Sequence, residues 1–381
     1  MKNKYVVILS LYFLFFAAPR QIVAKSQYGG KDSFSIDSLT QNLELDFRTS
    51  YGFYVHHHFE MSSYLAHFPM FELTLQKQTY GKSSWQAYFN YPIIGFTAFY
   101  SDLGNIDIMG KAYAIYPFIT FPFNKSKANT FGLRFGVGLG YLTEKFDHVK
   151  NYHNIAIGSN FNAAINLTFE YRHLISERSR ISVFAGLTHF SNGCSYYPNT
   201  GINIINAGAG LTFLINEPQE YIPKKTIKEN HLNVINPEYY LGMSLGIKRV
   251  RYRQTDNIGV CNLDFYIMDR ISNLSKIGIG LDLVYDATDN IAIAEAYKQQ
   301  KFSFWEILRP GIGLAYELMI GDASFLINFG YHPYGLELNH GHWYQKIGMK
   351  VNIGEYIYGK IALNTHFGVA DFIGLGIGVR L

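Results

Sequence analysis

The chain has 381 residues, a formal net charge of +4 at pH 7, and a composition that is 48% hydrophobic, 17% aromatic and only 16% charged. No internal apolar run is long enough for a membrane-spanning helix, and no basic run is typical of nucleic-acid binding. What remains is a series of short alternating segments rich in glycine and aromatic residues. This pattern is typical of a transmembrane β-barrel.

The N-terminus predicts export. Lys2 and Lys4 precede an apolar stretch at residues 5–18, and Ile22-Val23-Ala24 offers a cleavage site with small residues. We therefore interpret residues 1–24 as a signal peptide. Combined with the barrel pattern, this predicts a protein of the bacterial cell outer membrane.

From residue 42 onward, period-two alternation predicts about sixteen strands, with no helical period of comparable strength. The expected strands span 42–54, 62–77, 84–102, 108–121, 130–143, 157–173, 179–191, 202–216, 237–251, 259–269, 274–286, 305–319, 322–333, 342–353, 356–367 and 371–381. Short turn signals such as Gly321-Asp322 alternate with long polar loops such as 143–153. That alternation is expected of short periplasmic turns and long outer loops.

Most of these strands have one apolar face and one polar or glycine-rich face, as lipid outside and a polar interior require. The expected fold class is all-β, an antiparallel transmembrane β-barrel of about 16 strands. An alternative stays open, because both arrangements close every sheet edge. In it, an eight-stranded barrel over residues 25–216 is joined by a periplasmic connection, 217–236, to a second small barrel over 237–381.

The end of the seventh expected strand carries the candidate site. It reads Thr188-His189-Phe190-Ser191-Asn192-Gly193. His189 and Ser191 share one face of the strand because they are two residues apart, and Asn203 lies on the matching face of the next strand. These faces are largely aliphatic, so we expect the three side chains on the lipid-facing exterior near the outer rim. A polar cluster there is energetically costly and favours a functional site, although a simple polar rim and turn is the alternative.

The same string, followed by Pro198-Asn199-Thr200-Gly201-Ile202, resembles the PagL family of outer-membrane lipid A 3-O-deacylases, whose relatives are often called acyloxyacyl hydrolases. The resemblance implies an eight-stranded barrel over roughly residues 42–216. It also implies a serine esterase whose substrate is lipid A in lipopolysaccharide. Ser191 would be the nucleophile and His189 the general base.

The resemblance further implies that Asn192 and Gly193 lie where the oxyanion forms, with Asn199 as another candidate. The sequence departs from the family in one position, since Asn203 stands where the family has an acidic residue. An amide can orient an imidazole but cannot stabilise its charged form. Three outcomes remain open, of which we favour the first: Asn203 suffices, another acid such as Glu144 or Asp147 substitutes, or activity is lost.

Other motifs carry less weight. Cys194 and Cys261 could pair in an oxidising compartment. His56-His57-His58 and His340-Gly341-His342 suggest a metal site, but consecutive histidines on a strand point to opposite faces. We therefore expect no cofactor and no metal, and partners limited to lipid A and outer-membrane lipid, with no nucleic acid. The alternatives to an esterase are a non-catalytic barrel, either a porin-like channel or a structural protein with a decayed site, and an adhesin.

Overall fold

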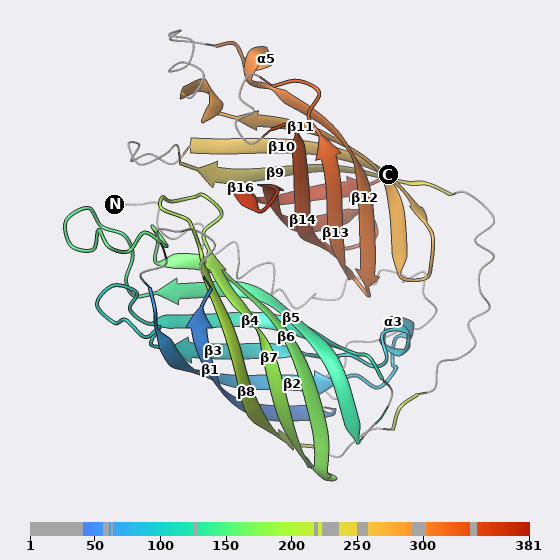
Figure 1. Cartoon of the computed structure of the whole chain (residues 1–381). Coiled ribbons are helices and arrows are strands. Elements are labelled where there is room, and N and C mark those ends of the chain that lie inside the picture. The colour runs from blue at the N-terminus through green and yellow to red at the C-terminus, as the bar shows by residue number, and fades with distance from the viewer. Residues whose placement is uncertain are drawn as a thin grey trace.

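The computed structural model describes residues 41–55, 61, 64–124, 126, 128–216, 220–222, 236–249, 258–291, 302–335 and 341–381. Within them the chain forms two closed antiparallel barrels of eight strands each (Figure 1). The expected single barrel of about 16 strands is therefore wrong, and the two-barrel alternative is right. The predicted signal peptide, 1–24, and most of the predicted connection, 217–236, lie outside the described residues.

The first barrel consists of β1 (Leu43–Tyr54), β2 (His67–Gln78), β3 (Ile93–Ser101), β4 (Ala112–Pro122), β5 (Asn129–Leu142), β6 (Phe161–Ser176), β7 (Ser179–Ser191) and β8 (Ile202–Leu214). Each strand pairs with the next, and β8 returns to β1 with Phe213 opposite Leu45. This closing contact separates the two halves, because β8 has no edge left for β9.

The second barrel consists of β9 (Glu238–Lys248), β10 (Ile258–Arg270), β11 (Ser275–Asp286), β12 (Arg309–Ile320), β13 (Ala323–Tyr331), β14 (Trp343–Asn352), β15 (Ile357–His366) and β16 (Val369–Arg380). It closes between β16 and β9, with Val379 opposite Leu241. Every strand edge in both barrels is thus paired, as the hydrocarbon interior of a membrane requires.

Two expected strands begin with short helices instead. The expected strand 84–102 starts with α3 (Ser84–Tyr88), and the expected strand 305–319 starts beside α5 (Phe304–Ile307). Local polar contacts explain the second case, since Glu306 Oε2 accepts a hydrogen bond from the Ser303 backbone N–H at 2.7 Å. That contact is one half of a helix capping box, which a strand pattern does not register. No helix in the described part of the chain is long and apolar enough to cross a membrane.

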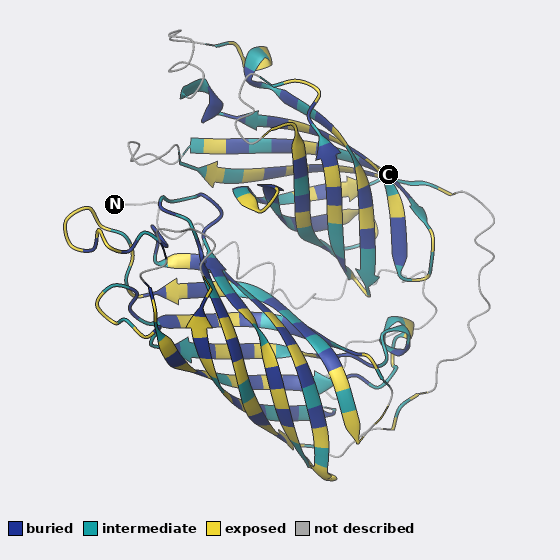
Figure 2. Ribbon diagram, in the orientation of Figure 1, coloured by how far each residue is buried: buried dark blue, intermediate teal, exposed yellow. Residues whose placement is uncertain are grey.

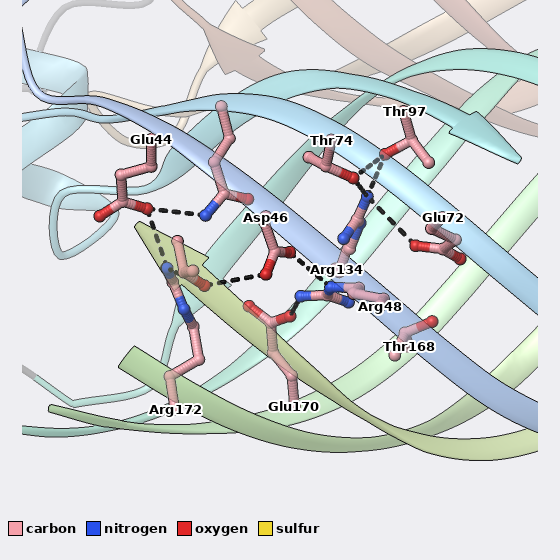
Figure 3. Close-up of polar contacts among 12 residues, drawn as sticks. Glu44, Asp46, Arg48, Glu72, Thr74, Thr97, Arg134, Thr168, Glu170 and Arg172 are labelled. Carbon is pink, nitrogen blue, oxygen red and sulfur yellow. Dashed lines mark hydrogen bonds and ion pairs between the residues drawn. The ribbon is translucent and has the colours of Figure 1, made fainter. Parts of the chain in front are cut away.

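Burial alternates along the strands (Figure 2). Outward side chains such as Phe47, Phe71 and Leu245 are exposed. Inward side chains of the first barrel form a polar network (Figure 3), in which Arg172 Nη2 lies 2.9 Å from Glu44 Oε2 and Arg48 pairs with both Asp46 and Glu170. An eight-stranded barrel is just wide enough for its side chains to fill it. The interior is therefore packed with side chains, which form this polar network and a hydrophobic cluster that includes Phe68, Tyr116 and Phe190.

The two barrels contact each other near both ends and between β5 and β13. The Phe135 ring of β5 packs edge-on against Phe325 of β13, with ring centroids 5.2 Å apart. Near α3, Asn273 Nδ2 donates to the Tyr88 hydroxyl at 2.7 Å. At the opposite end, the loop after β7 contacts β16. The end of β7 that carries the candidate site therefore lies next to the second barrel.

Candidate active site

The ladder between β7 and β8 brings the first two site residues together. His189 lies directly opposite Asn203, and His189 Nδ1 is 2.6 Å from Asn203 Oδ1. Thr188 and Phe190 are buried inside the barrel, so His189 and Ser191 point outward from the same face. The placement predicted from strand parity, on the exterior and near the end of the strand, agrees with the structure.

This contact fixes the chemistry of the imidazole. An amide oxygen can only accept a hydrogen bond, so His189 Nδ1 carries the hydrogen and Nε2 keeps its lone pair. A neutral histidine in this tautomer can take a proton from a neighbouring hydroxyl. Ser191, two residues further along the same outward face, carries such a hydroxyl.

The turn after Ser191 directs a backbone amide back at the serine. The Gly193 N–H donates to Ser191 Oγ at 3.3 Å. Two successive residues with positive φ make this turn possible, Gly193 at 59° and Cys194 at 62°. Glycine takes this conformation without steric cost. A donor in that position can stabilise negative charge that develops next to the serine.

The other two predicted oxyanion residues have different contacts. The Asn192 backbone N–H donates to Asn199 Oδ1 at 2.9 Å, and Asn192 Nδ2 donates to Ser159 Oγ at 3.0 Å. Asn199 Nδ2 lies 3.9 Å from Cys194 Sγ. Both amides therefore tie the loop together, whereas Gly193 directs its N–H at the serine.

Two residues to which the sequence pattern assigned no role support the site. Ser159 anchors Asn192 from the loop between β5 and β6, and no sequence signal marks it. Gly201, with φ at 77°, lies beneath the imidazole, and a Cβ added there would be 2.8 Å from His189 Cε1. The glycine of the Gly-Ile pair thus leaves room for the His189 ring, which a careful search for glycine requirements could have found.

Of the two acids considered as substitutes for Asn203, Asp147 is hydrogen-bonded within its own loop. Asp147 Oδ1 accepts hydrogen bonds from the backbone N–H groups of Val149 and Lys150, both at 2.9 Å. Glu144 packs near Gly110, in the loop between β3 and β4. Asn203 Oδ1 contacts His189 Nδ1 directly.

The other motifs lie only in part within the described residues. Cys194 and Cys261 are both free thiols. His56-His57-His58 and His340 lie outside the described residues. His342 Nδ1 lies 2.8 Å from the His332 carbonyl oxygen. Within the described ranges, no group of three or more possible metal-binding side chains occurs.

Comparison with known families divides the chain in the same way as the structure does. Residues 70–212 match the family described as lipid A 3-O-deacylase (PagL), and residues 237–381 match acyloxyacyl hydrolase, C-terminal domain. Each match falls on one barrel. No curated protein matches the chain.

Several solved structures are similar to the chain only at very low scores. A TodX deltaS2S3 mutant, a monoaromatic hydrocarbon channel, is 6% identical, with 89% of this chain and 90% of that chain covered and a TM-score of 0.19. A triple mutant of the Rhodopseudomonas blastica porin is 6% identical, with 89% and 99% covered and a TM-score of 0.18. CdiB from Acinetobacter baumannii is 9% identical, with 90% and 60% covered and a TM-score of 0.18. Scores this low support no conclusion about this chain.

Proposed function

The chain joins a PagL lipid A 3-O-deacylase domain to an acyloxyacyl hydrolase C-terminal domain, and on that premise we propose that it is an outer-membrane serine esterase that removes an ester-linked acyl chain from lipid A. The observation that carries the proposal is the 2.6 Å contact between His189 Nδ1 and Asn203 Oδ1. It prepares the imidazole next to a serine that also receives a backbone N–H.

The proposed reaction has two halves. Ser191 Oγ attacks the ester carbonyl carbon while its proton passes to His189 Nε2, and the Gly193 N–H stabilises the resulting oxyanion. The carbon–oxygen bond to the sugar then breaks, and His189 returns the proton to the departing sugar oxygen. Water attacks the acyl-enzyme with His189 again as base, which releases the fatty acid and restores the serine.

The surroundings of the site favour a lipid substrate over a soluble one. Phe161, Leu187 and Ile205 are outward-facing neighbours on β6, β7 and β8, and their exposed fractions are 52%, 36% and 41%. A barrel exterior of this kind faces acyl chains in a membrane. An ester of an outer-leaflet lipid could thus reach Ser191 without leaving the bilayer.

The interior of the first barrel weighs against the channel alternative. Arg134 and Arg172 are among the largest fully buried side chains described, and Arg134 packs over the Phe118 ring at 3.6 Å from its centroid. A channel requires an open aqueous lumen, and eight-stranded barrels are usually filled by side chains. The chemistry proposed here is therefore on the outer wall.

Mass spectrometry of lipid A tests the proposal. Cells that produce the protein should contain lipid A lacking one acyl chain, and Ser191→Ala should retain that chain. Ser179→Ala is the matched control, because it removes a hydroxyl from the other end of the same strand. Heat-modifiable gel mobility verifies that each variant is folded. Deacylation by Ser191→Ala at the wild-type level would refute the proposed nucleophile.

A further inference from the structure

The second barrel holds the loop that follows Ser191. Cys194 Sγ donates to the Ala370 carbonyl oxygen of β16 at 2.9 Å. The Cys194 carbonyl oxygen accepts a hydrogen bond from the backbone N–H of Arg249 at 3.1 Å. The Arg249 guanidinium lies 4.0 Å from the centre of the Tyr196 ring. Three contacts from one barrel therefore converge on a single short loop of the other.

The closest packing involves the proposed oxyanion donor. A Cβ added to Gly193 would lie 2.5 Å from Ile373 Cγ1 and 2.6 Å from Ile373 Cδ1. The Ile373 side chain of β16 is thus packed directly on the Gly193 backbone, whose N–H points at Ser191. If Ile373 moved away, no side chain of the second barrel would pack against the Gly193 amide at this point.

The covered surface extends beyond these residues. The Phe135–Phe325 contact lies on β5 and β13. The second barrel therefore contacts the first at β5 as well as at the loop after β7, which β16 supports.

We propose that the second barrel positions the oxyanion-forming turn of the first, with Ile373 as the positioning residue. The inference rests on the proposed esterase function. The Gly193 N–H lies outside the β7–β8 ladder, in a turn with two positive φ angles, so the ladder does not fix its direction. Displacement of a catalytic donor by about 1 Å can cost about a hundredfold in rate. Contact with Ile373 would prevent that displacement.

Kinetics of ester hydrolysis by the full chain test the role of Ile373. Ile373→Ala should lower kcat by about tenfold to a hundredfold with little change in KM, because it disturbs stabilisation of the transition state more than substrate binding. Ile373→Val should recover most of the activity. The matched control is Ile377→Ala on the same strand, since Ile377 is 67% exposed. Equal activity of the Ile373→Ala and Ile377→Ala variants would overturn the proposal.

A double-mutant cycle isolates the contact between the barrels. Gly193→Ala should lower activity through the clash with Ile373 and through the positive φ. In the Ile373→Ala background the clash is relieved, so the fold-loss caused by Gly193→Ala should be smaller. The same fold-loss in both backgrounds would show that the two residues do not interact.

Thiol labelling tests the contact between Ile373 and the loop after β7 without measuring ester hydrolysis. In a Cys261→Ser background Cys194 is the remaining thiol, and its burial against β16 raises its pKa. N-ethylmaleimide should label Cys194 slowly, and Ile373→Ala should accelerate labelling severalfold, whereas Ile377→Ala should not. If the wild type hydrolyses no ester but labelling follows this pattern, the proposed function fails while the positioning contact stands. Equal labelling in all three proteins refutes the contact.

Discussion

A carboxylate introduced at position 203 should accelerate the proposed ester hydrolysis. Asn203→Asp changes one amide nitrogen to oxygen and keeps the size and shape of the side chain, so the 2.6 Å contact with His189 Nδ1 can persist. The carboxylate then stabilises the imidazolium that forms as Ser191 loses its proton. Both oxygens of a carboxylate accept hydrogen bonds, so the tautomer with hydrogen on Nδ1 is kept in the variant.

The size of the effect follows from the geometry. Unit charges about 4 Å apart at an effective dielectric constant of about 20 attract by about 4 kcal/mol. His189 and Asn203 are only half-buried, so solvent screening reduces this to about 1.4–2.8 kcal/mol. That corresponds to a tenfold to hundredfold increase in kcat, at about 1.4 kcal/mol for each factor of ten. The reverse change in a Ser-His-Asp protease costs about ten-thousand-fold, which sets an upper limit.

Single-turnover hydrolysis of lipid A in detergent micelles measures this rate directly. Asn203→Leu is the partner variant, since it removes the hydrogen bond but keeps a side chain of similar size, and its rate should fall below that of the wild type. If Asn203→Asp folds and is no faster than the wild type, while Asn203→Leu is no slower, the contact with His189 does not prepare the base.

Two further predictions concern stability. Arg172→Met removes the closer of the two arginines that pair with Glu44 inside the first barrel and leaves Arg180, whose Nε lies 3.9 Å from Glu44 Oε1. The free energy of unfolding in urea should therefore fall by up to about 3–5 kcal/mol. Glu44→Gln in the same chain should recover part of this loss, and no recovery would show that the pair is not coupled. In the loop after β11, burial raises the pKa of Asp289 to about 8 although Arg309 opposes the shift. The folded state then binds a proton at Asp289 more tightly than the unfolded state does. The contribution of Asp289 to the free energy of unfolding is therefore full below about pH 4 and is lost as the pH rises through about 8. Asp289→Asn should remove this component from the pH dependence of urea unfolding, and an unchanged pH profile would contradict the raised pKa.

The alternation of apolar and polar residues was sufficient to predict the strands and part of the site. The seventh strand was predicted at 179–191 and is observed as Ser179–Ser191, because its alternation is regular and a polar turn ends it. Its parity placed His189 and Ser191 outside the barrel. The same parity on β8 placed Asn203 beside them, and the register confirms it.

Barrel closure could not be predicted in this way. Alternation within a strand depends on residues two apart, whereas closure depends on whether β8 pairs with β1 or with β9. Both choices bury the same faces and satisfy every backbone edge, so the sequence pattern is equally compatible with either. Ser159 and Ile373 were missed for the same reason, since each meets the catalytic loop only through the tertiary fold.

The two sides of the proposed catalytic centre depend on different parts of the molecule. His189 and Asn203 face each other across a continuous ladder, so the first barrel alone determines the geometry of the base. Gly193 lies beyond the last ladder pair, in a turn that packs against β16 of the second barrel. The effects of Asn203→Asp on the base and of Ile373→Ala on the oxyanion donor should therefore multiply in the double variant, because they act on separate supports. A combined effect well below that product would mean that the base and the donor move together.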